Sequence, residues 1–273
     1  MKVREIVRRI EEQLPLSWSE EWDNSGLLVG DPESSADKIA VALDATEHSI
    51  LRAIGMNCGM LVTHHPVIFR SIDRVVLPSP EAQAISASLK GGTAVYSSHT
   101  SWDSSPEGVN VILSNLLGLK DFSPLLYPRG GAWGMGSIGR LRRPATLSSL
   151  ARAVRDAWGL SYLSAYGDGS APLNLAALCG GAGGDFLQAA IDRGADVYIT
   201  ADVSYHCVMQ AQAANIALIT VNHGEMEAAS LPGLRDLLKE ATGLGVELLE
   251  NSNWIPSLIG AGRRGQGRRA RTA

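Results

Sequence analysis

A pair of adjacent histidines is the feature of this sequence that most directly suggests metal chemistry. His64 and His65 follow a short apolar run and precede Pro66, which ends the extended segment. Adjacent side chains on an extended backbone point to opposite sides, so the two imidazoles could bind two ions lying side by side rather than chelate one. A hydrogen-bonded turn without metal is the alternative interpretation of the pair taken alone.

Two histidine–carboxylate pairs with a spacing of four residues accompany the histidine pair. His223 precedes Glu227, and His99 precedes Asp103 in the same way. Side chains four positions apart share one face of a helix, which is how such pairs hold a metal in other proteins. The spacing is common by chance. Asp103 could nevertheless bridge two ions, and a single carboxylate would then suffice at the centre.

The expected ligand set combines three imidazoles with two carboxylates: His64, His65, Asp103, His223 and Glu227. Nitrogen and oxygen donors of this kind suit Zn, Fe, Mn, Co or Ni and suit Ca poorly. Five side chains do not fill the coordination of two ions, and open positions are typical of catalytic rather than structural metal sites. The sequence therefore favours two divalent transition-metal ions that can activate water near neutral pH.

Short apolar runs alternating with helical stretches would position these residues. The runs are residues 39–43, 60–63 and 94–97, and the last two end beside His64 and His99. Alternation of this kind predicts β-α-β units on a mainly parallel, buried sheet. In such sheets ligands collect at the carboxyl ends of the strands, which is where these histidines lie.

The second half of the chain repeats this plan. Strands are expected at residues 173–178, 197–200 and 216–221, with a helix at 185–193. Because both halves also carry the histidine–carboxylate spacing, we predict an α/β fold of two similar, pseudo-duplicated domains. The expected boundaries are 1–125 for the first domain, with 223–257 returning to it, 126–222 for the second domain after a glycine-rich passage, and 258–273 for a basic tail.

Bulk composition narrows the class of protein. The 273 residues are 45% hydrophobic and 19% charged, which suffices for two domains with buried cores. A formal net charge of −4 argues against nucleic acid as the main partner. Five arginines of the tail leave open either a solvated segment or a weak contact with RNA or another anionic surface; they are Arg263, Arg264, Arg268, Arg269 and Arg271.

The cysteines and the apolar runs indicate the compartment. Cys58, Cys179 and Cys207 are far apart and odd in number, which argues against a disulfide framework and fits the reducing cytoplasm. No apolar run approaches the ~20 residues that a membrane helix needs, and the N-terminus begins with an amphipathic pattern. We therefore expect a soluble cytoplasmic protein without membrane contact.

Six short motifs, in this order, resemble those of the NIF-three-like family, whose members are often named GTP cyclohydrolase 1 type 2 homologues or dinuclear metal-centre proteins. They are residues 22–30, 43–46, 63–66, 99–103 and 200–206 and the pair His223 and Glu227. The resemblance covers about residues 20 to 255. It implies two α/β domains with a two-metal site between them, the ligand set given above, and a ring-shaped homo-oligomer, commonly a hexamer. Ala201 and Asn222 stand where the family usually has glycine, which affects backbone freedom but not the ligands.

Residues near the expected site have several open roles. His99 could orient a ligand or act as a catalytic acid or base, and a structural role is the alternative. His206 matches the family pattern without a clear task. The glycine turn at 179–184 could cradle a phosphate, although such turns are common without ligands. Trp22, Asp23 and Asn24 are expected to serve packing and turn formation.

Two functions from different classes follow. The first is a metal-dependent hydrolase acting on a nucleotide-like or phosphate-bearing small molecule. The resemblance suggests ring opening of GTP, but no feature of the sequence identifies a guanine pocket. The second is a non-enzymatic metal-binding, metal-delivery or regulatory protein whose open site passes ions to a partner.

Overall fold

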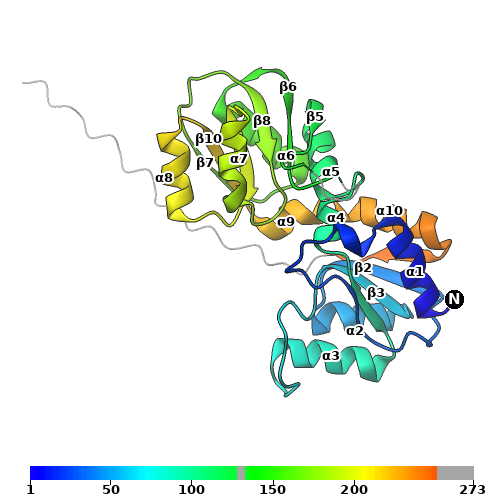
Figure 1. Ribbon diagram of the computed structural model, residues 1–273. Coiled ribbons are helices and arrows are strands. Elements are labelled where there is room, and N and C mark those ends of the chain that lie inside the picture. Colours follow the sequence, from blue (N-terminus) through cyan, green and yellow to red (C-terminus); the bar gives the residue numbers. More distant parts are fainter. Residues whose placement is uncertain (128–132, 251–273) are drawn as a thin grey trace, which may run out of the picture.

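The computed structural model describes residues 1–127 and 133–250. In this part the chain forms two lobes, each built on its own β-sheet (Figure 1). Two short helices, α4 (Thr100–Asp103) and α9 (His223–Ala228), lie between the lobes. Both helices carry candidate ligands, so the fold brings these residues to the junction.

The first sheet has five strands in the order β1-β4-β3-β2-β11, and only β1 runs antiparallel to its neighbour. The strands are β1 (Gly26–Val29), β2 (Lys38–Asp44), β3 (Met60–His65), β4 (Ala94–Ser97) and β11 (Gly245–Leu248). Helices α1 (Val3–Gln13) and α10 (Leu231–Thr242) cover one face, and α2 (Glu47–Gly55) and α3 (Pro80–Gly91) cover the other. A 3-10 turn, η1 (Leu16–Trp18), follows α1.

Burial on both faces explains why the central strands have continuous apolar runs. In β2, Ile39 and Val41 pack into the core formed with α1 and α10. Ala40 and Ala42 pack on the opposite side, with residues of α2 and α3. A strand buried on both faces has no polar alternation, which is the pattern of parallel sheets in α/β proteins.

The second sheet has six strands in the order β5-β6-β8-β9-β10-β7. Its parallel centre is β8 (Leu173–Leu178), β9 (Val197–Ala201) and β10 (Ala217–Val221), and its antiparallel flanks are β5 (Lys120–Ser123), β6 (Ser137–Ala145) and β7 (Leu163–Tyr166). Helices α5 (Val109–Leu117) and α6 (Leu147–Trp158) pack on one face. The turn η2 (Gly184–Phe186) and helices α7 (Leu187–Asp192) and α8 (Tyr205–Ala213) lie on the other.

Both lobes contain the same four-strand unit. In the first lobe the spatial order is β1-β4-β3-β2, and in the second it is β7-β10-β9-β8. In each unit three successive parallel strands are neighbours, and the strand that precedes them in sequence pairs antiparallel with the last. Helix α4 follows β4 and helix α9 follows β10. The predicted fold of two similar α/β domains is confirmed.

The strand pairing places two segments relative to the expected domain boundaries. Strand β5 belongs to the second sheet, although the boundary at residue 125 assigned it to the first domain, because its backbone pairs with β6. Strand β11 pairs in parallel with β2 of the first sheet. The arginine-rich tail lies outside the described residues. Within the described part, no helix is long and apolar enough to cross a membrane.

Candidate metal centre

The histidine pair ends the central strand of the first sheet. His64 is fully buried, and His65 is partly exposed. Nδ1 of His64 lies 3.2 Å from the Ser98 carbonyl oxygen, and the Ser97 hydroxyl donates to the His64 carbonyl at 2.8 Å. The neighbouring strand thus fixes the His64 ring with Nε2 left for the interior of the site.

Helix α9 delivers His223 and Glu227 from the second lobe. The Asn222 side chain caps the helix by accepting from the backbone N–H of Glu225 at 2.9 Å. One helical turn later, Oε2 of Glu227 lies 3.0 Å from Nε2 of His223. The spacing of four residues therefore does place both groups on one face, as expected.

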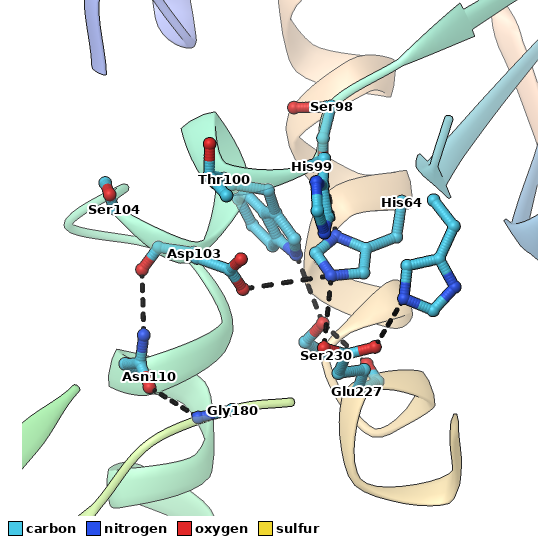
Figure 2. Close-up of polar contacts among 12 residues, drawn as sticks. His64, Ser98, His99, Thr100, Asp103, Ser104, Asn110, Gly180, Glu227 and Ser230 are labelled. Carbon is cyan, nitrogen blue, oxygen red and sulfur yellow. Dashed lines mark hydrogen bonds and ion pairs between the residues drawn. The ribbon is translucent and has the colours of Figure 1, made fainter. Parts of the chain in front are cut away.

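The carboxylates of Asp103 on α4 and Glu227 on α9 converge on His64 (Figure 2). Nε2 of His64 lies 3.4 Å from Oε1 of Glu227 and 3.8 Å from Oδ1 of Asp103. Nε2 of His65 lies 2.9 Å from Oε2 of Glu227. All five predicted ligands are thus within reach of one small volume, and they come from three segments far apart in the sequence.

Three atoms of this cluster are buried without a hydrogen-bond partner: Nε2 of His64, Oδ1 of Asp103 and Oε2 of Glu227. The Glu227 oxygen lies 2.9 Å from Nε2 of His65 and 3.0 Å from Nε2 of His223, without a hydrogen bond to either. Leaving buried polar atoms unpaired is costly, so such atoms call for an explanation. Binding to a cation explains all three.

The protonation equilibria support this explanation. Burial alone would lower the pKa of His65, but Asp44 and Glu227 outweigh it and raise the pKa to about 10. The pKa of His223 rises to about 9 against the same effect of burial, through Glu227 and Asp202. Burial favours a neutral Glu227, yet the surrounding histidines hold its pKa well below the usual range. Without an ion, protons must balance the buried carboxylate charge, and a divalent cation can replace them.

The outer nitrogens of the histidines have acceptors of their own. Nδ1 of His65 lies 2.8 Å from Oδ1 of Asp44, and Nδ1 of His223 lies 2.6 Å from Oδ2 of Asp202. A carboxylate or carbonyl on Nδ1 fixes the ring and leaves Nε2 as the donor to a metal, which is the usual arrangement around metal-bound histidine. Asp44 is the last residue of β2 and Asp202 directly follows β9, and neither was predicted from the sequence as a supporting residue.

Three groups of side chains have their ligand atoms within 4.8 Å of one another and could hold a metal ion. One is His64, Asp103 and Glu227, and another is His65, His223 and Glu227. Glu227 is common to both, whereas Asp103 belongs to one. The geometry thus favours Glu227, and not Asp103, as the carboxylate shared between two positions.

His99 lies beside the cluster and forms the third group, with His64 and His65. Its Nδ1 lies 2.7 Å from Oδ1 of Asp23. Asp23 also accepts from the Thr100 hydroxyl at 2.6 Å and the Ser25 hydroxyl at 2.8 Å. Burial alone would raise the pKa of Asp23, but these hydrogen bonds hold it well below the usual range. Asp23 is therefore an anchor of the site as well as a turn residue.

The glycine turn after β8 closes the site from the second lobe. Gly181 has a φ of +67°, and a β-carbon there would lie 2.4 Å from Oε1 of Glu227. Asn110 joins this turn to α4, because it accepts from Gly180 N–H at 2.9 Å and donates to the Asp103 carbonyl at 3.0 Å (Figure 2). The turn thus lies against the cluster itself.

A cavity of about 980 Å³ opens onto the cluster. The site residues that line it are His65, His99, Asp103, His223 and Glu227, together with Gly180 and Gly181. His206 is exposed on α8, stacks edge-on with Tyr205 and belongs to none of the three groups. The structure therefore does not bring His206 into the site.

Lobes that meet at such a cluster define a two-domain α/β protein with a candidate metal centre between its domains. The profile of the family described as Duf34/NIF3 (NGG1p interacting factor 3) matches residues 1–253. The chain belongs to this family.

Relatives and solved structures agree with this assignment. The GTP cyclohydrolase 1 type 2 homolog of Clostridium acetobutylicum is 34% identical over 261 residues, which cover 93% of this chain and 97% of the relative. NIF3-like protein 1 of Drosophila melanogaster is 29% identical over 235 residues, covering 84% of this chain and 79% of that protein. The crystal structure of a Bacillus cereus protein related to NIF3 superposes with a TM-score of 0.89 at 19% identity, over 95% of this chain and 99% of that one. The fold of the family thus extends over nearly the whole chain.

Proposed function

We propose that the centre holds two divalent transition-metal ions and that the protein is a metal-dependent hydrolase acting on a nucleotide-like small molecule. The observation that carries the proposal is the set of buried atoms without partners on His64, Asp103 and Glu227. Their imidazole and carboxylate chemistry fits Zn, Fe, Mn, Co or Ni. The first ion would take His64, Asp103 and Glu227, and the second His65, His223 and Glu227.

The donor set leaves room for chemistry. Each group supplies three protein ligands, and an open position is the mark of catalytic sites. Bound ions of this kind activate water near neutral pH and stabilise developing negative charge. The 980 Å³ cavity gives a small molecule access to the side of the cluster that His65 and His223 line.

The residues of the chain have distinct tasks in this proposal. Asp44 and Asp202 orient the rings of His65 and His223. His99, held by Asp23 and facing the cavity, is placed to accept or deliver a proton at the substrate. The glycine turn and Trp22 bound the volume in which the substrate lies.

Metal content and turnover test the proposal together. Elemental analysis of the protein purified without chelator is expected to give about two equivalents per chain, falling to about one in Asp103→Ala. Hydrolysis is then measured on a panel of nucleosides and nucleotides with each metal. Less than one equivalent after attempted reloading would refute the paired centre, and loaded protein without turnover on any compound would refute the hydrolase.

Metal delivery is the second candidate, and the acidic lining of the cavity favours it. Glu20 and Asp185 line the cavity beside the cluster and would attract cations. Transfer of labelled metal to an acceptor apoprotein, faster than its release to a dilute chelator, would support this function over hydrolysis. Assembly into a homo-oligomer, a hexamer by the resemblance, is a further proposal that light scattering tests.

A further inference from the structure

An aromatic wall lines the cavity on the side of the first lobe. Trp22 and Phe69 line the cavity, and 59% and 47% of their surfaces are exposed. Their ring centroids lie 5.9 Å apart, and each lies 5.9 Å from the ring of His99. Large aromatic faces left open at the mouth of a cavity next to a polar cluster are typical of ligand sites.

The wall is held in place by polar contacts of the residues around it. Asp23, next to Trp22, is hydrogen-bonded to His99 and Thr100. Asn24 donates to the carbonyl of Ile68, which precedes Phe69. The loops that carry the two rings are therefore tied to each other and to the cluster, so the wall exists before any ligand arrives. Such preorganisation lowers the entropy lost on binding.

The second lobe contributes a wall of the cavity that is formed mainly by backbone. Residues Gly180, Gly181 and Ala182 line the cavity there. Gly180 N–H donates to Asn110, and Gly183 N–H donates to Thr200. Within the described part of the chain, the N–H groups of Gly181 and Ala182 have no hydrogen-bond acceptor. They are available to a carbonyl or ring nitrogen of a ligand.

Charge distinguishes between an uncharged ring and a polyphosphate as the occupant. Among the described lining residues there is no lysine or arginine, whereas Glu20 and Asp185 both contribute carboxylates. Asp185 follows the glycine turn directly and lines the cavity, so its carboxylate would repel a phosphate bound beside that turn. A triphosphate chain would meet the carboxylates of Glu20 and Asp185, and no cationic side chain among the described lining residues would offset them.

We propose that the cavity binds a planar, uncharged heterocycle of nucleobase type between the wall of Trp22 and Phe69 and the backbone of Gly180–Ala182, with one ring edge toward the metal cluster and no subsite for a polyphosphate. The direction of the reacting edge rests on the proposed hydrolase. The binding of the ring does not rest on it, because the two walls are present whether or not the ligand reacts.

Calorimetric titration of metal-loaded protein with defined probes tests this inference. The probes are guanosine, adenosine and uridine and their 5′-triphosphates, each at low and high salt. At least one nucleoside is expected to bind, with affinity insensitive to salt, and its triphosphate is expected to bind no more tightly. Trp22→Ala should weaken nucleoside binding about tenfold, the usual order for loss of a base-stacking aromatic residue, and Trp22→Phe should restore most of it.

Tyr205→Ala removes an aromatic ring that is exposed on α8, outside this cavity, and should leave nucleoside affinity unchanged. Metal content is measured for every variant to confirm that the cluster is intact. Triphosphates that bind more than about tenfold tighter than nucleosides, with a steep salt dependence, would overturn the proposal. So would nucleoside binding that Trp22→Ala leaves intact, or no saturable binding by any nucleoside.

The outcome is separable from that of the proposed function. Nucleoside binding that depends on Trp22, in a loaded protein that turns over nothing, supports this inference and refutes the hydrolase. Hydrolysis whose KM does not change in Trp22→Ala would support the hydrolase and refute the binding of the ring against Trp22.

Discussion

The two lobes place different residues at corresponding positions of the duplicated unit. Strand β3 ends with His64 and His65, whereas the matching strand β9 ends with Ala201 and is followed by Asp202. The first lobe thus supplies two imidazoles directly, one fully buried. The second lobe supplies Asp202, whose backbone has a φ of +50° and whose carboxylate contacts Nδ1 of His223. The end of β3 therefore supplies candidate ligands, whereas the end of β9 supplies a residue that orients one.

The helices after the last parallel strands differ in a similar way. Asp103 on α4 approaches His64 at 3.8 Å and belongs to one candidate group. Glu227 on α9 has a longer side chain and lies between His64, His65 and His223. Equivalent positions in a duplicated fold therefore need not be equivalent in the site, because one methylene decides how many neighbours a carboxylate can reach.

The largest effect is expected from Glu227→Gln. The substitution keeps the shape of the side chain but removes the charge that both candidate groups share, so both ions should be lost. Asp103→Asn, by contrast, affects one group and should leave about one equivalent bound. Elemental analysis after gel filtration gives both numbers.

Glu225→Gln is the matched control for this comparison. Glu225 lies on the same helix but binds the backbone and hydroxyl of Ser161, away from the cluster. Its loss should leave the metal content unchanged. Equal loss of metal in Glu227→Gln and Asp103→Asn would show that the two carboxylates are equivalent and that the asymmetry inferred here is wrong.

A smaller effect is expected from the carboxylates that orient the histidine rings. Asp44→Asn and Asp202→Asn each weaken the hold on one Nδ1 and should lower metal affinity about 10- to 100-fold. Asp44 is less exposed than Asp202, 37% against 59% of the side chain, so its loss should have the greater effect. Competition with a fluorescent chelator measures both metal affinities. A larger loss of affinity in Asp202→Asn than in Asp44→Asn would contradict this expectation.

The sequence predicted the parallel centres of both sheets but not their antiparallel flanks. Strands buried on both faces leave a continuous apolar run, as in β2 and β9. Strand β6 has the sequence Ser-Ile-Gly-Arg-Leu-Arg-Arg-Pro-Ala and is largely exposed after Gly139, and β7 is mostly exposed as well. Flanking strands of this kind are specified by pairing with a neighbour, and their local sequence contains no corresponding signal.

The same distinction applies to the site. The five candidate ligands could be found from residue type and spacing, since histidine pairs and four-residue spacings are local features. The sharing of Glu227, the anchoring of His99 by Asp23 and the aromatic wall depend on segments far apart in the sequence. Thr100 and Asp23, which are hydrogen-bonded, are 77 positions apart, and His64 and Glu227 are farther apart still. Only the three-dimensional structure shows which of these segments meet.

The smallest expected effect is a pH dependence that separates His65 from His223 in the metal-free protein. Both have pKa values raised above the ordinary 6.5, to about 10 and about 9. Their stabilising effect is therefore complete below pH 6.5 and is lost as pH rises through about 9 for His223 and about 10 for His65. Chelator-stripped protein should lose on the order of 5 °C in Tm over this window.

His223→Gln should remove the lower part of the decline in Tm, and His65→Gln should remove the upper part. His48→Gln, at an exposed position, should change neither part. Metal-loaded protein should show no such decline, because deprotonated imidazoles are the form that binds an ion. A Tm of stripped protein that is constant from pH 6.5 to 10 would mean that the carboxylates do not hold these imidazoles protonated, and that the charge balance of the empty cluster is different from the one inferred here.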